Sequence, residues 1–146
     1  MRTYSLRIYG RPRPKRRPRK GKGGNFYTPR ETKEWEAAVL AAWVEKFGPD
    51  PIFPPDCPLA IGMWFYFSDR RVPDLSNLQK AIEDALCSKD LPFNVIGDDK
   101  RIVLSVAVRH PDPVPKEEEG VEIIVVPFYK AQAFAAWRAL VQEGGA

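Results

Sequence analysis

Two patterns of apolar residues predict the strands of this protein. Residues 2–9 alternate apolar and polar positions, with Tyr4, Leu6 and Ile8 as apolar members, and a period of two is typical of a strand with one buried face. The uninterrupted apolar and aromatic run at 59–67 instead favours a central strand buried on both faces. Two further strands are expected at 100–109 and 121–128.

Three segments show the helical period. The first follows Thr28, the expected N-cap, has Pro29 at its first position and runs to about Phe47. The others are predicted at 74–87 and 130–142. The order β-α-β-α-β-β-α predicts one α+β domain over residues 1–146, with helices packed on one face of a mixed β-sheet.

Charge divides the chain into two unequal parts. Residues 1–22 contain ten Lys and Arg and no acid, whereas the remaining 13 basic and 19 acidic residues give net −6. Residues 11–24, here called the basic loop, are too rich in Pro and Gly for a helix or an inner strand. We therefore expect a loop that is mobile or ordered by a substrate.

The density of cations in the basic loop favours a nucleic-acid partner over a merely solubilising segment, because so many like charges between folded elements call for a counter-anion. The nearby Phe26 and Tyr27 are expected to anchor the loop to the body, with stacking on unpaired bases as the alternative. The candidate DNA-binding residues are Arg11, Arg13, Lys15, Arg16, Arg17, Arg19, Lys20 and Lys22.

The segment P-D-L-S-N-L-Q-K-A-I-E-D-A-L at 73–86 is the first candidate for chemistry. On a helical wheel its apolar residues form one buried face, and a polar stripe lies opposite. A solvated face with an aspartate N-cap is the ordinary explanation, but a lysine beside carboxylates is also common where charge on a phosphate must be stabilised. The polar residues concerned are Asp74, Ser76, Asn77, Lys80 and Asp84.

A second group of carboxylates, Asp98 and Asp99, precedes the strand at 100–109. A Gly-Asp turn would explain it equally well. If the pair approaches Asp74 and Asp84, however, the carboxylates supply the hard oxygen ligands that Mg²⁺ prefers. Such an ion would lower the pKa of a bound water and stabilise displacement at a phosphodiester.

Other features exclude some classes of protein. Cys57 and Cys87 are too few for a disulfide framework and lack the spacing of a zinc site, so we expect buried or idle thiols. The longest apolar run is under half of a membrane span, and the start M-R-T-Y-S-L-R-I-Y-G lacks the apolar region of a signal peptide. We expect an intracellular, cytoplasmic protein without membrane contact.

The chain resembles the RusA family of Holliday junction resolvases, small Mg²⁺-dependent endonucleases of phage and prophage origin. The likeness covers residues 2–128 and includes G-R-P-R-P-K-R-R-P-R, Y-T-P-R-E-T-K-E-W-E and P-D-L-S-N-L-Q-K-A-I-E-D-A-L. The combination of D-x-x-N-L-x-K-x-x-x-D-A-L with the later D-D-K-R-I is its most specific part. The segment after Phe128 lies outside the likeness.

The resemblance implies a set of site residues. Asp74 matches the first aspartate of the family's D-x-D-N motif, Lys80 its lysine, and Asp99 the second member of its D-D pair, which would make these three catalytic. The implied Mg²⁺ ligands, with Mn²⁺ as a possible substitute, are Asp74, Asp84, Asp98 and Asp99. Ser76 replaces the motif's second aspartate with a weaker, neutral ligand, and Asn77 is a supporting residue.

The expected function is resolution of four-way DNA junctions in recombination and repair by paired, symmetric nicks. Two nicks related by a two-fold axis require two active sites, which predicts a homodimer. The alternatives are a non-catalytic nucleic-acid-binding module and a nuclease of broader specificity for branched DNA.

Overall fold

Four strands form a mixed sheet in the order β1-β6-β4-β5. The computed structural model describes residues 3–27, 29–87 and 95–130. β4 and β5 are parallel, which requires a crossover between them, and both other pairs are antiparallel. The strands are β1 (Tyr4–Tyr9), β4 (Leu59–Tyr66), β5 (Ile102–Arg109) and β6 (Gly120–Pro127).

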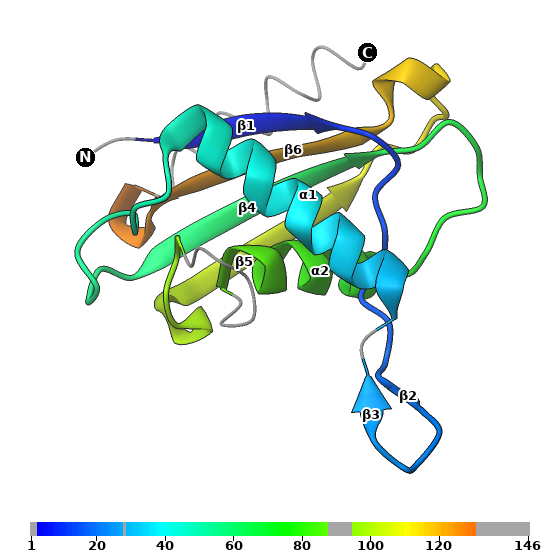
Figure 1. The fold of residues 1–146 in the computed structure, drawn as a ribbon. Coiled ribbons are helices and arrows are strands. Elements are labelled where there is room, and N and C mark those ends of the chain that lie inside the picture. The colour runs from blue at the N-terminus through cyan, green and yellow to red at the C-terminus, as the bar shows by residue number, and fades with distance from the viewer. Residues whose placement is uncertain (1–2, 28, 88–94, 131–146) are drawn as a thin grey trace.

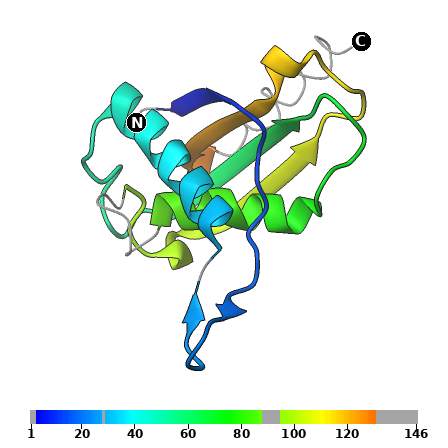
Figure 2. The same ribbon diagram turned by 45° about the vertical axis from the view of Figure 1, so that its right-hand side comes forward.

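Two helices cover one face of this sheet (Figures 1 and 2). α1 (Arg30–Phe47) connects the N-terminal region to β4, and α2 (Leu75–Cys87) belongs to the crossover from β4 to β5. The main core lies between helices and sheet, where Trp43 and Phe65 are fully buried. The body also contains three short 3₁₀ turns: η1 (Asp99–Arg101), η2 (Lys116–Glu118) and η3 (Phe128–Lys130).

A small hairpin projects away from the body (Figure 1). Its strands, β2 (Arg19–Lys20) and β3 (Phe26–Tyr27), pair antiparallel around a glycine-rich turn. The sequence did not predict this pairing, because two-residue strands carry no readable period. The basic loop therefore consists of an extended segment close to the body followed by one arm of a projecting hairpin.

Gly120 marks a close approach of two backbones at the start of β6. Its φ is +157°, and a Cβ added there would lie 2.0 Å from the carbonyl oxygen of Ile8 on β1. Because that obstacle is backbone rather than a flexible side chain, the position accepts only glycine without a shift of one strand. The pairing of β1 with β6 depends on this residue.

The structure confirms the predicted α+β class and the mixed sheet with helices on one face. One boundary differs: Pro29 is the extended N-cap of α1 rather than its first helical residue, because α1 begins at Arg30. Thr28 and the predicted helix at 130–142 lie outside the described residues, except that Lys130 closes η3. Among the described helices, none has both the length and the apolarity needed to span a membrane.

Candidate active site and nucleic-acid interface

α2 positions the predicted chemistry by burying one face and exposing the other. Leu78, Ile82 and Leu86 are fully buried against the sheet. A hydrogen-bonded chain also attaches α2 to β5: Gln79 donates to the hydroxyl of Ser105 (2.5 Å), which donates to Glu83 (2.6 Å). The polar stripe of α2 is therefore held facing outward, as the helical wheel predicted.

Lys80 and Asp84 form an ion pair on this stripe, with Lys80 Nζ 3.2 Å from Asp84 Oδ1. The hydrogen bond to Asp84 raises the pKa of Lys80, with further attraction from Glu83 and Asp99. Lys80 therefore remains a cation at neutral pH. This state suits the stabilisation of phosphate charge and not proton abstraction.

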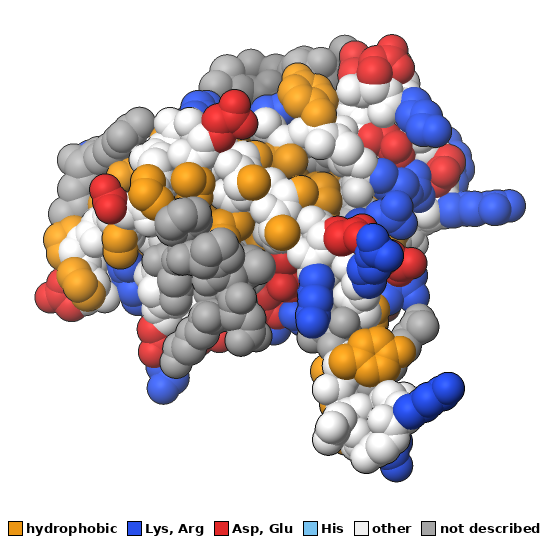
Figure 3. Space-filling model, in the orientation of Figure 1, with side chains coloured by type: hydrophobic (Ala, Val, Ile, Leu, Met, Phe, Trp, Pro, Cys, Tyr) orange, Lys and Arg blue, Asp and Glu red, His pale blue; other side chains and the backbone are white. Residues whose placement is uncertain are grey.

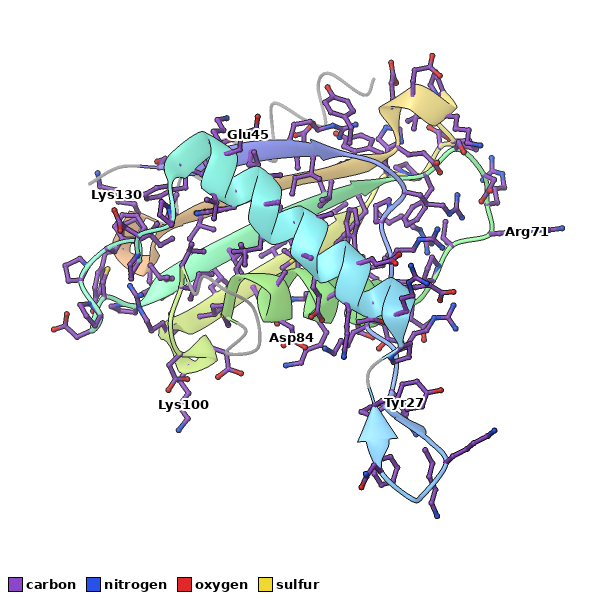
Figure 4. All side chains as sticks on the ribbon, viewed as in Figure 1. Tyr27, Glu45, Arg71, Asp84, Lys100 and Lys130 are labelled. Atoms are coloured by element: carbon purple, nitrogen blue, oxygen red, sulfur yellow. The ribbon has the colours of Figure 1, made fainter. Side chains whose placement is uncertain are left out.

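Asp98 and Asp99 lie at η1, which packs beside α2. The carboxylate of Asp98 caps this turn by accepting from the backbone N–H of Lys100 (2.9 Å). Figure 4 shows Asp84 on α2 between η1, which carries Lys100, and the hairpin, which carries Tyr27. The negative charge of Asp99 raises the pKa of both Lys80 and Cys87 on α2.

Asp74 occupies the other end of α2. It is exposed and immediately precedes the helix, and its carbonyl oxygen accepts from the N–H of Leu78 (3.1 Å). Asp84 follows ten residues later, which at 1.5 Å per residue separates the two by about 15 Å along the axis. Two aspartates so far apart do not reach one ion.

The four predicted metal ligands are thus divided between two places. Among the described residues, no three His, Cys, Asp or Glu side chains form a group able to hold a metal ion. Lys80 and Lys15 already neutralise Asp84, whose Oδ2 lies 3.3 Å from Lys15 Nζ. The full set of four carboxylates does not fit one metal ion within a single chain, whereas the exposed Asp98–Asp99 pair offers the oxygen ligands of a largely hydrated Mg²⁺.

The two remaining predicted residues of α2, Ser76 and Asn77, are exposed in its first turn. The backbone oxygen of Asn77 accepts from the N–H of Lys15 (2.8 Å), which joins the basic loop to the start of α2. Beside this junction lies a surface hollow of about 570 Å³. It is lined by Pro14, Lys15, Arg16, Arg17, Pro18, Pro73 and Asn77.

The eight candidate DNA-binding residues have different environments. Arg11 binds Glu119 (2.7 Å) and Asp69 (3.1 Å), and Lys15 binds Glu36 (2.7 Å). Arg16 lies 3.9 Å from Glu31. Four others are exposed and have no carboxylate within 4 Å in the described part of the chain: Arg13, Arg17, Lys20 and Lys22. The side chain of Arg19 lies outside the described residues.

Phe26 and Tyr27 do not anchor the hairpin to the body. Phe26 is 73% exposed and Tyr27 is 49% exposed. Figure 3 shows apolar and basic side chains together on the projecting hairpin. The structure therefore favours the alternative, in which these rings are available to a partner.

Glu36 is a charged residue of this region that sequence reasoning missed. It lies on the buried side of α1 between Trp35 and Val39, with a side-chain exposure of 7%. The sequence did contain an indication that Glu36 is buried, because position 36 falls inside the apolar stripe of the helix. A carboxylate in such a stripe needs a partner.

Both cysteines, Cys57 and Cys87, are partly buried. Both are free. Burial, together with the negative charge of Asp99, Glu83 and Asp84, raises the pKa of Cys87 to about 12. The thiol is therefore protonated and unreactive at neutral pH.

Comparison with known proteins places the chain in a class of DNA-cutting enzymes. Residues 9–126 match the family model of endodeoxyribonuclease RusA, a span that contains the basic loop, α2 and η1. The chain therefore belongs to the RusA family of endodeoxyribonucleases. No curated protein matches the chain.

Proposed function

We propose that this protein is an endonuclease that resolves four-way DNA junctions by paired, symmetric nicks in recombination and repair. The match to the RusA family model over residues 9–126 is the observation that carries the proposal. The charges agree with it, because the basic loop contacts α2, which carries Lys80 and Asp84, through Lys15, and several of its other cations have no carboxylate within 4 Å among the described residues. The compartment would be the cytoplasm of a bacterial or phage-infected cell.

In this proposal the residues have separate tasks. The exposed arginines and lysines of the basic loop bind phosphates along the backbone, and Lys80 stabilises charge on the phosphate that is cut. Asp99, with Asp98, would hold a Mg²⁺ ion, for which Mn²⁺ could substitute. The ion would supply an acidified water and charge neutralisation. Asp74, immediately before the start of α2, is the third aspartate proposed to take part in catalysis.

A homodimer is part of the proposal. One chain contributes one set of these residues, and symmetric cutting of both strands needs two sets related by a two-fold axis. Sizing and light scattering should give a dimer, with and without junction DNA. A monomer under both conditions would contradict this part.

The central test compares a labelled four-way junction with a linear duplex of the same sequence, each with Mg²⁺ and with EDTA. We expect paired nicks in the junction only, and only with the metal. Asp99→Asn should retain binding and lose cleavage, because it removes a metal ligand and one negative charge. Asp50→Asn, at an exposed aspartate beyond α1, is the matched control and should cut normally.

Other outcomes would assign another function. Tight junction binding without cleavage at any metal concentration would identify a non-catalytic DNA-binding module. Equal cutting of flaps, forks and junctions would identify a nuclease of broader branched-DNA specificity. Cleavage by Asp99→Asn at the rate of the unmodified protein would remove Asp99 from the chemistry.

A further inference from the structure

Among the described residues, the contact between Lys15 and Glu36 is the most buried ion pair that the basic loop makes with a helix. Lys15 Nζ lies 2.7 Å from Glu36 Oε1 and 3.3 Å from Asp84 Oδ2. Glu36 belongs to α1 and Asp84 to α2, so one ammonium group bridges the two helices. The Lys15 backbone N–H also donates to Asn77 of α2.

The burial of Glu36 makes this contact more than a surface ion pair. Its side chain is almost fully buried, and Lys15 is its one partner among the described residues. A buried carboxylate without its cation destabilises the folded state, so the fold is more stable with Lys15 in place. Burial alone would lower the pKa of Lys15, but hydrogen bonding and attraction to Glu36, and then to Asp84, raise it. Lys15 is consequently a cation at neutral pH.

Lys15 lies between exposed arginines of the basic loop, so its contacts also affect where those arginines lie. Arg13 precedes it, and Arg16 and Arg17 follow it, all with exposed side chains. Fixing Lys15 therefore fixes the direction of the neighbouring arginines. It also keeps Arg16 and Arg17 at the wall of the hollow of about 570 Å³, opposite Pro73 and Asn77 at the start of α2.

We propose that Glu36 is a positioning residue that, through Lys15, holds the basic loop beside α2 and so maintains the hollow in which a phosphate of the DNA backbone binds. This inference rests on the proposed function. Lys15, which the sequence predicted to contact DNA, instead binds two carboxylates of the protein itself. Arg16 and Arg17 are the residues left to face the phosphate.

The attachment is tested first without DNA, by the initial rate of trypsin cleavage. Glu36→Gln should speed cleavage after Lys15 and Arg16 by roughly tenfold, since a released segment fits a protease more readily. Cleavage after Lys20 and Lys22, in the hairpin, should not change and is the internal control. Glu34→Gln, at an exposed acid of the same helix, should leave all rates unchanged.

The consequence for DNA is tested by kinetics on a four-way junction. Glu36→Gln should raise KM roughly tenfold at an unchanged kcat, because the loop binds the backbone and does not touch the reacting atoms. Lys15→Arg keeps the charge and should retain the wild-type KM, whereas Lys15→Gln should not. If Glu36→Gln does not fold, Glu36→Leu with Lys15→Ala removes both charges. This variant keeps the trypsin site after Arg16, and it should show faster cleavage there and a raised KM.

Two results would overturn the proposal: wild-type trypsin rates after Lys15 and Arg16 in folded Glu36→Gln, or faster cleavage with an unchanged KM. A wild-type protein that neither binds nor cuts any DNA would overturn the proposed function. The trypsin rates would then still decide the attachment on their own.

Discussion

The two parts of the basic loop have similar compositions and opposite environments. In the part nearest the body, Arg11 and Lys15 are bound by buried carboxylates of the protein. In the hairpin, Lys20 and Lys22 are exposed beside Phe26, which is also exposed. Counting cations along the sequence treats these residues as equivalent. The structure separates those that hold the loop in place from those that remain for a partner.

The part of the basic loop nearest the body, residues 11–17, is attached to the body at two points. Arg11 binds Glu119 and Asp69 and also donates to the carbonyl of Arg71 (2.7 Å), which fastens the loop to the turn after β4. Lys15 fastens it to α1 and α2. The exposed cations are consequently presented from a fixed base, which lowers the entropy lost when they bind a polyanion.

The largest effect should come from the exposed cations. Replacing Arg13, Arg17, Lys20 and Lys22 together with Gln removes up to four phosphate contacts. The dependence of log K on log salt for duplex DNA should become less steep by about 3 to 4. Titrations at several salt concentrations measure this slope, and thermal unfolding should be unchanged. A slope equal to that of the unmodified protein would place the DNA on another surface.

A smaller loss of affinity is expected for Phe26→Ala. Stacking of a base on an aromatic ring contributes about 1–3 kcal/mol, so junction binding should weaken by roughly tenfold. Duplex binding should change less, because internal base pairs of a duplex are stacked on both faces, whereas those at the centre of an open junction have one uncovered face. Phe26→Trp should retain junction affinity, and Tyr129→Ala, at an exposed ring of η3, is the control. Equal losses on junction and duplex would contradict a stacking role.

The smallest effect on binding, but a clear effect on stability, is expected for Arg11→Gln. It leaves Glu119, whose side chain is 5% exposed, without its cation, which should lower the free energy of unfolding by about 1–3 kcal/mol. Denaturant unfolding measures this change. Arg13→Gln, two residues away and exposed, should not be destabilised. Equal stability of the two variants would contradict the distinction between cations that hold the loop in place and cations that remain for a partner.

The pH dependence of unfolding sharpens this test. Burial alone would raise the pKa of Glu119, but hydrogen bonds from Ser68 and Arg11 outweigh it and lower the pKa below the ordinary value of 4.5. A lowered folded-state pKa means that the stabilisation is fully present above pH 4.5 and is lost as the pH falls through the folded-state pKa. Arg11→Gln should therefore lose less stability than the unmodified protein on acidification.

Local patterns predicted the elements of the fold well. The strand at β1 and the charged stripe of α2 follow from periods read over a few residues, and the central strand β4 follows from an uninterrupted apolar run. The position of Lys80 and Asp84 on one stripe follows from the same period, and the structure confirms their contact.

Contacts between residues far apart in the sequence could not be predicted from local patterns. Nothing local indicates that Lys15 meets Glu36 and Asp84, because that contact depends on the path of the loop across two helices. The division of the predicted metal ligands, in contrast, is a local property. The rise of an α-helix over ten residues is by itself enough to keep Asp74 and Asp84 from sharing one ion.

The glycine at the start of β6 carries a genetic consequence. Every missense change of a glycine codon introduces a side chain, and at position 120 the first atom of any side chain collides with the backbone of β1. Random mutagenesis should therefore recover substitutions at this codon only among inactive or temperature-sensitive alleles. A library scored for activity would mark position 120 as intolerant, although no chemistry takes place there.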